Sequence, residues 1–249
     1  MPENTLPAFE RGLALGADGL ELDVHLSRDG VVVVHHDRAL DRTTNLAGPI
    51  AARTAAELAS ADAAHWFRAG DAFPYRGRGI GVPRLADVLE RHAETRVIIE
   101  LKADSEALAG AAVDDIRRAR AIDRVCLGGF ARRALCAVRA LEPRIATSAW
   151  REEVRWALYR SWVGLTPRRP AYQGFQVPER SGRTRVVSPR FVSTMRRAGL
   201  SVQVWTVDTE ADARRLLSWG VSGLITDRPD IVVPVVRGAG TVTGGPSRA

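Results

Sequence analysis

Short apolar runs and segments with helical spacing alternate along most of this chain. Repeated alternation of this kind is typical of parallel strands covered by helices, so we predict an α/β fold. In a closed barrel of this class the catalytic groups sit at the C-terminal ends of the strands. The apolar runs predict strands at 19–25, 31–36, 97–101, 125–130, 144–149, 174–177, 202–207 and 223–226. The helical spacing predicts helices at 105–120, 132–140, 152–159, 189–198 and 210–219.

The first residues predict a helix ahead of the first strand. Leu6, Phe9 and Leu13 recur at helical spacing. Asn4 is a suitable N-cap for this helix, and Gly16 is a suitable stop. Residues 40–95 instead mix turn signals with short helices.

Two carboxylates lie on the first predicted strand. Glu21 and Asp23 are two residues apart, so on a strand both project from the same face. Neighbouring buried carboxylates repel each other unless a positive charge lies between them, and a hard divalent cation such as Ca²⁺ or Mg²⁺ fits that need. The turn at 27–30 sends a second apolar run back toward them, and that run ends at His36. A metal beside a histidine predicts a site for phosphate chemistry.

Composition and length predict one globular domain. The chain has 249 residues, of which 45% are hydrophobic, and α/β barrels of this length are common single domains. We assign the domain to residues 1–235, with a disordered Gly-, Ser- and Thr-rich tail at 236–249. No apolar run is long enough to span a bilayer and no signal peptide is recognisable in the chain as given, so stable membrane insertion is not expected and the default expectation is a cytoplasmic protein.

The net charge of +7 is carried mostly by arginines scattered over predicted helices and loops. Such scattered charge attracts anionic substrates through the electrostatic field of the whole protein. Nucleic acid is not an expected partner, because the densest arginine cluster has no interleaved aromatic residues. The oligomeric state stays open.

Later strands add further candidates. Glu100 and Lys102 share a face of the strand at 97–101 and its end, which adds a third carboxylate and a cation. Trp205 lies on the strand at 202–207. Each has a structural alternative: Glu100 and Lys102 as an ion pair at a barrel mouth, and Trp205 as a core residue. Structural roles are likewise the alternative for three other polar residues, His25, His35 and Asp227.

The combination of short motifs resembles the glycerophosphodiester phosphodiesterase family, in the family's order and over about residues 2–230. The matching segments are Pro2-Glu3-Asn4-Thr5, Glu21-Leu22-Asp23-Val24, Asp29-Gly30, His36-Asp37, Leu40-Asp41-Arg42-Thr43-Thr44, Ile99-Glu100-Leu101-Lys102, Val204-Trp205-Thr206-Val207-Asp208 and Ile225-Thr226-Asp227-Arg228-Pro229. The resemblance implies a TIM-type (β/α)₈ barrel that uses a divalent cation, Ca²⁺ or Mg²⁺, to hydrolyse small glycerophosphodiesters to glycerol 3-phosphate and an alcohol.

The same resemblance implies roles for individual residues. Glu21, Asp23 and Glu100 match the metal ligands, and His36 matches one of two catalytic histidines. By the same match Lys102 contacts the phosphate in catalysis. Trp205 packs against the glycerol part, and Glu3 belongs to the substrate-binding residues. The segment 40–85 matches the family's short insertion.

One departure from the family pattern stands at the start of the chain. Family members begin with a strand ending in His-Arg-Gly, whereas Met1 here directly precedes Pro2. The family's second catalytic histidine and a phosphate-binding arginine are therefore not in the chain as given, and we expect it to lack the first barrel strand, keep the metal site and have little activity. A misplaced start and a true truncation both stay open.

Two other functions stay open. The missing His-Arg favours a catalytically inactive barrel that binds a phosphodiester or a protein partner. A related lysophospholipase D-type enzyme would need an apolar surface near the barrel mouth. The aromatic residues Trp150, Trp156, Tyr159 and Trp162 offer such material, although helix packing explains them equally well.

Overall fold

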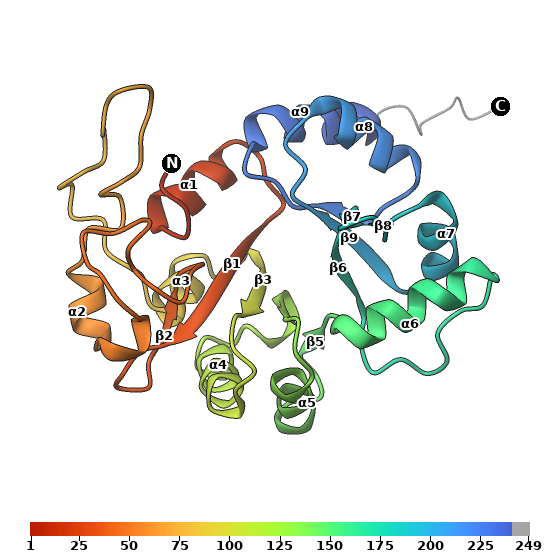
Figure 1. The fold of residues 1–249 in the computed structure, drawn as a ribbon, viewed down its shortest axis with the longest axis horizontal. Coiled ribbons are helices and arrows are strands. Elements are labelled where there is room, and N and C mark those ends of the chain that lie inside the picture. The colour runs from red at the N-terminus through yellow and green to blue at the C-terminus, as the bar shows by residue number, and fades with distance from the viewer. Residues whose placement is uncertain (241–249) are drawn as a thin grey trace. The chain divides into compact units, whose positions relative to one another are not determined.

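The computed structural model describes residues 1–240 (Figure 1). These residues form two compact units. The first unit contains residues 1–14 and 18–150, and the second contains residues 15–17 and the described residues from 151 onward. The sequence predicted one domain over 1–235. It carries no Gly- or Pro-rich linker at the boundary between Trp150 and Arg151, so composition gave no sign of this division.

The first unit is built on a five-stranded sheet in the order β2-β1-β3-β4-β5. β1 pairs in parallel with β3, β3 with β4 and β4 with β5, as the strand–helix alternation predicted. β2 is antiparallel to β1 because Gly30, at φ +78°, closes a tight turn between them. The strands are β1 (Gly19–Leu26), β2 (Val32–Val34), β3 (Arg96–Leu101), β4 (Val125–Gly128) and β5 (Ala146–Thr147).

Helices of the first unit bury one face of this sheet. Leu22, Ile99 and Leu127 project from β1, β3 and β4 into a core shared with the helices that follow the strands. The polar residues that alternate with them, Glu21 and Glu100 among them, are therefore on the opposite face. The helices are α1 (Leu6–Ala14), α2 (Ala55–Ala59), α3 (Leu85–Arg91), α4 (Glu106–Arg118) and α5 (Arg132–Leu141), with 3₁₀ turns η1 (Ile50–Ala52) and η2 (Ile122–Arg124).

The segment 40–85 has a small core of its own. Leu40, Ile50 and Leu58 are buried together with Val33 of β2 and Val82. α2 begins with a capping box in which Thr54 accepts from the Glu57 amide and the Glu57 side chain accepts from the Thr54 amide. The segment 40–85, which matches the family's short insertion, is thus folded and packs against β2.

The first helix does not start as the sequence predicted. α1 begins at Leu6, and the Thr5 hydroxyl accepts from the Ala8 amide at 3.4 Å while the Thr5 carbonyl accepts from the Ala8 and Phe9 amides. Thr5 is therefore the cap, and the prediction that Asn4 caps the helix is wrong. Asn4 has φ +53° and turns its side chain toward β1.

The second unit combines a three-stranded parallel sheet, in the order β10-β9-β6, with four helices. Phe175 of β6 packs edge-on against Phe191 of α7, with ring centroids 5.3 Å apart, and both side chains are fully buried. The elements are α6 (Arg151–Trp162), β6 (Gly174–Pro178), α7 (Pro189–Arg197), β9 (Ser201–Trp205), α8 (Glu210–Ser218), β10 (Gly223–Leu224) and α9 (Pro229–Gly240), with a hairpin of β7 (Arg180–Ser181) and β8 (Thr184–Arg185).

The end of the domain lies further along the chain than predicted. α9 continues to Gly240, so residues 236–240, assigned from composition to a disordered tail, are helical. Composition misplaced this boundary because Arg237 and the glycines around it read as linker, although Arg237 donates to the Gly16 carbonyl at 3.0 Å. The remainder of the predicted tail, 241–249, lies outside the described residues.

Candidate active site

Three carboxylates meet on the polar face of the sheet in the first unit. Asp23 and Glu100 are direct partners in the parallel register of β1 and β3, and Glu21 lies two residues before Asp23 on the same face. One carboxylate oxygen from each residue lies within 4.8 Å of the other two. The structure therefore brings together the three predicted metal ligands, near the C-terminal ends of both strands.

Lys102 is the cation closest to this cluster. Its Nζ lies 2.9 Å from Asp23 Oδ1 and 3.0 Å from Glu100 Oε1, and its side chain is largely buried. Burial lowers the pKa of an ammonium, but the two carboxylates outweigh this effect and the pKa of Lys102 is raised. Lys102 is thus positively charged at neutral pH and offsets part of the cluster's negative charge.

Glu100 is the least satisfied of the three carboxylates. Within residues 1–240 its buried Oε1 accepts no hydrogen bond of good geometry, and the contact with Lys102 is an ion pair only. Burial is the main reason that the pKa of Glu100 is raised, and the Lys102 ammonium opposes the shift. A buried carboxylate oxygen without a directed donor, beside two further carboxylates, is suited to a hard divalent cation.

Asn4 holds one of the predicted ligands in place. Its side-chain Nδ2 donates to Asp23 Oδ2 at 2.8 Å, and its Oδ1 accepts from the Asp23 amide at 3.2 Å. The contact spans 19 residues, so the sequence contained no local signal for it beyond the occurrence of Asn4 in a motif. This residue was missed as a part of the site because its position before a helix suggested a cap.

His36 follows β2 and is held by an ionised carboxylate. Its Nδ1 lies 2.7 Å from Asp37 Oδ1, and Arg42 donates to both oxygens of Asp37. The Arg42 guanidinium is the main reason that the pKa of Asp37 lies well below its usual range. Since an ionised carboxylate only accepts hydrogen bonds, Nδ1 is the donor in this contact and Asp37 does not engage Nε2.

Arg42 also binds the predicted substrate-binding residue Glu3. Its Nη1 and Nη2 donate to the two Glu3 oxygens at 2.7 and 2.5 Å, and this interaction lowers the pKa of Glu3. Glu3, Arg42, Asp37 and His36 therefore form one continuous chain of polar contacts. His36 also lies close enough to Glu100 to favour its ionised form, which places this chain beside the carboxylates.

His25 and His35 are both buried and hydrogen-bonded. His35 is 4% exposed; its Nδ1 donates to the Asp37 carbonyl at 2.8 Å and its Nε2 accepts from the Thr43 hydroxyl at 2.9 Å. His25 is also buried, with its Nε2 3.2 Å from the His36 carbonyl. Burial lowers the pKa of both imidazoles. Their hydrogen bonds fix the backbone around His36.

Because His35 is buried and neutral, it should make the fold sensitive to acid. Its folded pKa lies below its ordinary value of 6.5, so the unfolded chain takes up the proton first and stability is lost as the pH falls through that range. His35→Asn, whose amide can still donate to the Asp37 carbonyl, should reduce the slope of unfolding free energy against pH between about 7 and 5 by up to ~1.4 kcal/mol per pH unit. Urea unfolding at several pH values measures this slope, and equal slopes for the two proteins would contradict the prediction.

The predicted substrate contact Trp205 belongs to the second unit, where it ends β9. Its predicted role is independent of the cluster geometry above and stays a prediction. Asp227, a candidate with a turn residue as its alternative, follows β10, and its backbone amide donates to Asp208 Oδ1 at 2.9 Å.

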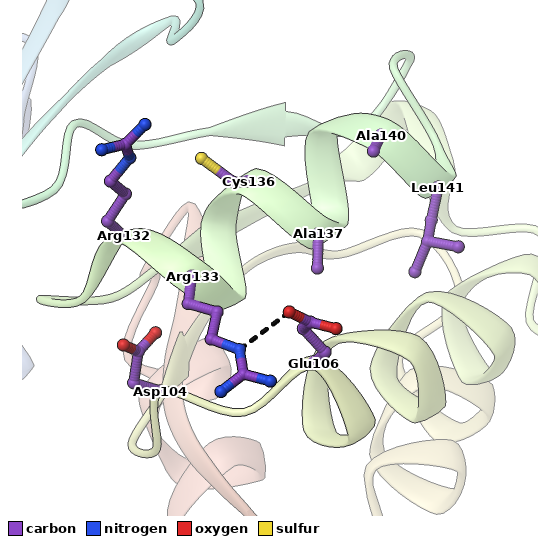
Figure 2. Close-up of a pocket in the computed structure, with 8 residues that line it drawn as sticks. All are labelled: Asp104, Glu106, Arg132, Arg133, Cys136, Ala137, Ala140 and Leu141. Atoms are coloured by element: carbon purple, nitrogen blue, oxygen red, sulfur yellow. Dashed lines mark hydrogen bonds and ion pairs between the residues drawn. The ribbon is translucent and has the colours of Figure 1, made fainter.

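A pocket elsewhere in the first unit does not coincide with the carboxylates. It lies between the start of α4 and α5, where Arg133 points toward Glu106 and pairs with it at 2.7 Å (Figure 2). Asp104, on its rim, accepts from the Ala134 amide at 2.9 Å. Of the charged groups that line this hollow, Arg133 and Glu106 pair with each other and Asp104 binds a backbone amide, and none of the predicted site residues is among them.

Comparison with known proteins gives a consistent result. The sequence model of the glycerophosphoryl diester phosphodiesterase family matches residues 1–231. A glycerophosphodiester phosphodiesterase of Caldanaerobacter subterraneus is 29% identical over 245 residues, covering 96% of this chain and 94% of that protein.

Solved structures agree with the sequence match. The crystal structure of glycerophosphodiester phosphodiesterase from Agrobacterium tumefaciens is 28% identical, with a TM-score of 0.77 over 95% of this chain and 94% of that one. An Oleispira antarctica phosphodiesterase, in complex with the product sn-glycerol-3-phosphate, is 26% identical, with a TM-score of 0.76 over 95% of this chain and 92% of that one.

Proposed function

This chain belongs to the glycerophosphoryl diester phosphodiesterase family, and from that premise we propose that it hydrolyses glycerophosphodiesters to glycerol 3-phosphate and an alcohol, using a divalent cation. The family and the TIM-type α/β fold expected from the motifs are confirmed by the match and by the solved structures, as is the enzyme class, a phosphoric diester hydrolase. The identity of the alcohol is not part of the proposal.

The observation that carries the proposal is the carboxylate cluster with its buried lysine. Glu21, Asp23 and Glu100 offer oxygens within 4.8 Å of one another, and hard oxygen donors are the ligands that Ca²⁺ and Mg²⁺ prefer. We propose that these three residues hold one such ion. When bound, the ion would supply positive charge that stabilises the phosphoryl group in the transition state.

The side chains around the cluster supply the remaining chemistry. The Lys102 ammonium adds positive charge where the phosphoryl oxygens become more negative. His36 exchanges a proton at Nε2, while Asp37 holds the opposite ring nitrogen and Arg42 keeps Asp37 ionised. We propose that Glu3, which Arg42 positions, is a substrate-binding residue. The role proposed for Trp205, packing against the glycerol part, comes from the family resemblance.

The test combines metal binding with product release. We expect Ca²⁺ or Mg²⁺ to raise the melting temperature, since an ion at about 100 times its Kd stabilises a protein by ~2.7 kcal/mol. We also expect slow release of glycerol 3-phosphate from glycerophosphocholine that depends on the ion and stops with a chelator. A folded chain that shows neither a shift nor ion-dependent release would overturn the proposal.

A further inference from the structure

The outer face of α6 in the second unit carries an exposed row of aromatic side chains. Trp156, Tyr159 and Trp162 are 65%, 45% and 55% exposed, although the sequence left open whether they pack in the core. The residues of α6 that are buried are small or aliphatic, namely Ala157, Leu158 and Ser161. The aromatic rings therefore lie on the solvent side of the helix.

The three rings form one surface. Their spacing of three residues puts them on the same helix face, and the ring centroids lie 6.4 Å apart from Trp156 to Tyr159 and 5.1 Å from Tyr159 to Trp162. Val163 and Leu165, which follow the helix, are 68% and 51% exposed and extend this surface. We call these five residues the aromatic patch. Contiguous exposed apolar residues of this kind mark an interaction site.

Arginines surround the aromatic patch. Arg155 precedes Trp156 on α6, Arg168 follows in the next loop, and Arg190 of α7 lies near Gly164, its Nη2 being 3.9 Å from the position that a Cβ on Gly164 would take. All three are exposed, and none of them forms an ion pair with another residue of the described range 1–240. Two carboxylates, Glu152 and Glu153, lie in the first turn of α6, four and three residues before Trp156, and Glu153 is engaged with a partner of its own. The exposed arginines outnumber these carboxylates, so the surroundings of the patch carry a net positive charge.

We propose that the aromatic patch and its arginines dock this protein on the surface of an anionic lipid bilayer. Trp and Tyr favour the boundary between hydrocarbon and water, because one part of each ring system is apolar and the other forms hydrogen bonds. Unpaired arginines beside them are attracted to anionic headgroups. A second copy of the chain fits less well, because like-charged arginines would face each other across the contact.

The docking would be peripheral. Within residues 1–240 no helix is both long and apolar enough to cross a bilayer. A helix that carries rings and arginines on one face binds instead at the headgroup level. The proposal is independent of the proposed catalytic function.

The test is flotation of the full chain with vesicles of phosphatidylcholine alone or of equimolar phosphatidylcholine and phosphatidylglycerol. We expect binding to the anionic vesicles, weakened at least tenfold by high salt, and little binding to the neutral ones. The double variant Trp156→Ala, Trp162→Ala should bind at least about tenfold more weakly. Trp66→Ala, which removes a ring that is 51% exposed outside the patch, should bind normally.

A second pair of variants separates local charge from total charge. Arg155→Gln with Arg168→Gln should weaken binding by about tenfold or more. Arg132→Gln with Arg183→Gln, which lowers the net charge equally at exposed positions elsewhere, should not. All variants should keep the melting temperature and its shift with metal, since the substituted side chains are exposed.

Three results would overturn the proposal. The first is no binding of the unsubstituted chain to anionic vesicles, and the second is equal binding of the patch variants and their controls. The third is a concentration-dependent dimer in sedimentation that the Trp156 and Trp162 substitutions abolish, without any vesicle binding. Flotation does not depend on catalysis. A protein that floats with anionic vesicles but releases no glycerol 3-phosphate therefore supports docking and speaks against the proposed catalytic function.

Discussion

Glu100→Gln is expected to weaken metal binding strongly while leaving the metal-free protein at least as stable as before. Burial opposes the ionised form of Glu100, as its raised pKa shows, and Glu100 shares the Lys102 ammonium with Asp23 while a third carboxylate, Glu21, lies beside them. The neutral amide removes that electrostatic cost, and Lys102 keeps its contact with Asp23 at 2.9 Å. A lost ligand should weaken metal affinity by at least about a hundredfold, since even partners outside the first ligand shell contribute ten- to a hundredfold.

Melting curves with and without Ca²⁺ or Mg²⁺, together with calorimetric titration of the ion, test this expectation. Glu94→Gln is the matched control, because Glu94 is exposed in the same unit and outside the cluster. The two effects of Glu100→Gln have opposite directions. The melting temperature without metal stays the same or rises, whereas its rise on addition of metal becomes smaller. A variant that melts lower without metal but retains the full metal-induced shift would show that Glu100 is a structural residue and no ligand.

His36→Gln is expected to lower kcat by about a hundred- to ten-thousand-fold, the usual contribution of a general acid or base. Glutamine keeps a donor near the Asp37 carboxylate but has no group that exchanges a proton near neutral pH. The His36 side chain is 52% exposed, so the fold and the metal-induced rise in melting temperature should persist.

The measurement is glycerol 3-phosphate release at saturating metal, with kcat and KM determined separately. His65→Gln serves as the control, since His65 is another histidine of this unit and pairs with Asp62 in the segment 40–85. Loss of activity caused by a higher KM alone would assign His36 to substrate binding. Unchanged kcat would remove it from the proposed mechanism.

The sequence predicted those parts of the site that depend on the spacing within one strand. Glu21 and Asp23 had to share a face, as did Glu100 and Lys102, because strand side chains alternate. The juxtaposition of the two pairs depends instead on the parallel register of β1 with β3, in which Asp23 lies opposite Glu100. Spacing within a strand does not specify that register, and family resemblance alone pointed to it.

Contacts between distant segments were the features that the sequence did not reveal. Asn4 has the side chain of a helix cap and stands before a helix, yet Thr5 caps α1 and Asn4 binds Asp23. Similarly, the aromatic residues of α6 occur at a spacing that fits a buried face as well as an exposed one. Only packing shows that Ala157 and Leu158 face the core instead.

The hydrogen bonds of Asn4 have a practical consequence for handling this protein. Asn4 binds a predicted metal ligand directly, Glu3 is held by Arg42, and Met1 is only three positions before Asn4. Three residues span at most about 10 Å, so any affinity tag joined ahead of Met1 emerges beside the carboxylate cluster. A polyhistidine tag at that position would compete for the very ion under study. An affinity tag at the C-terminal end of the chain avoids this competition, so that a titration of the site with metal can be interpreted.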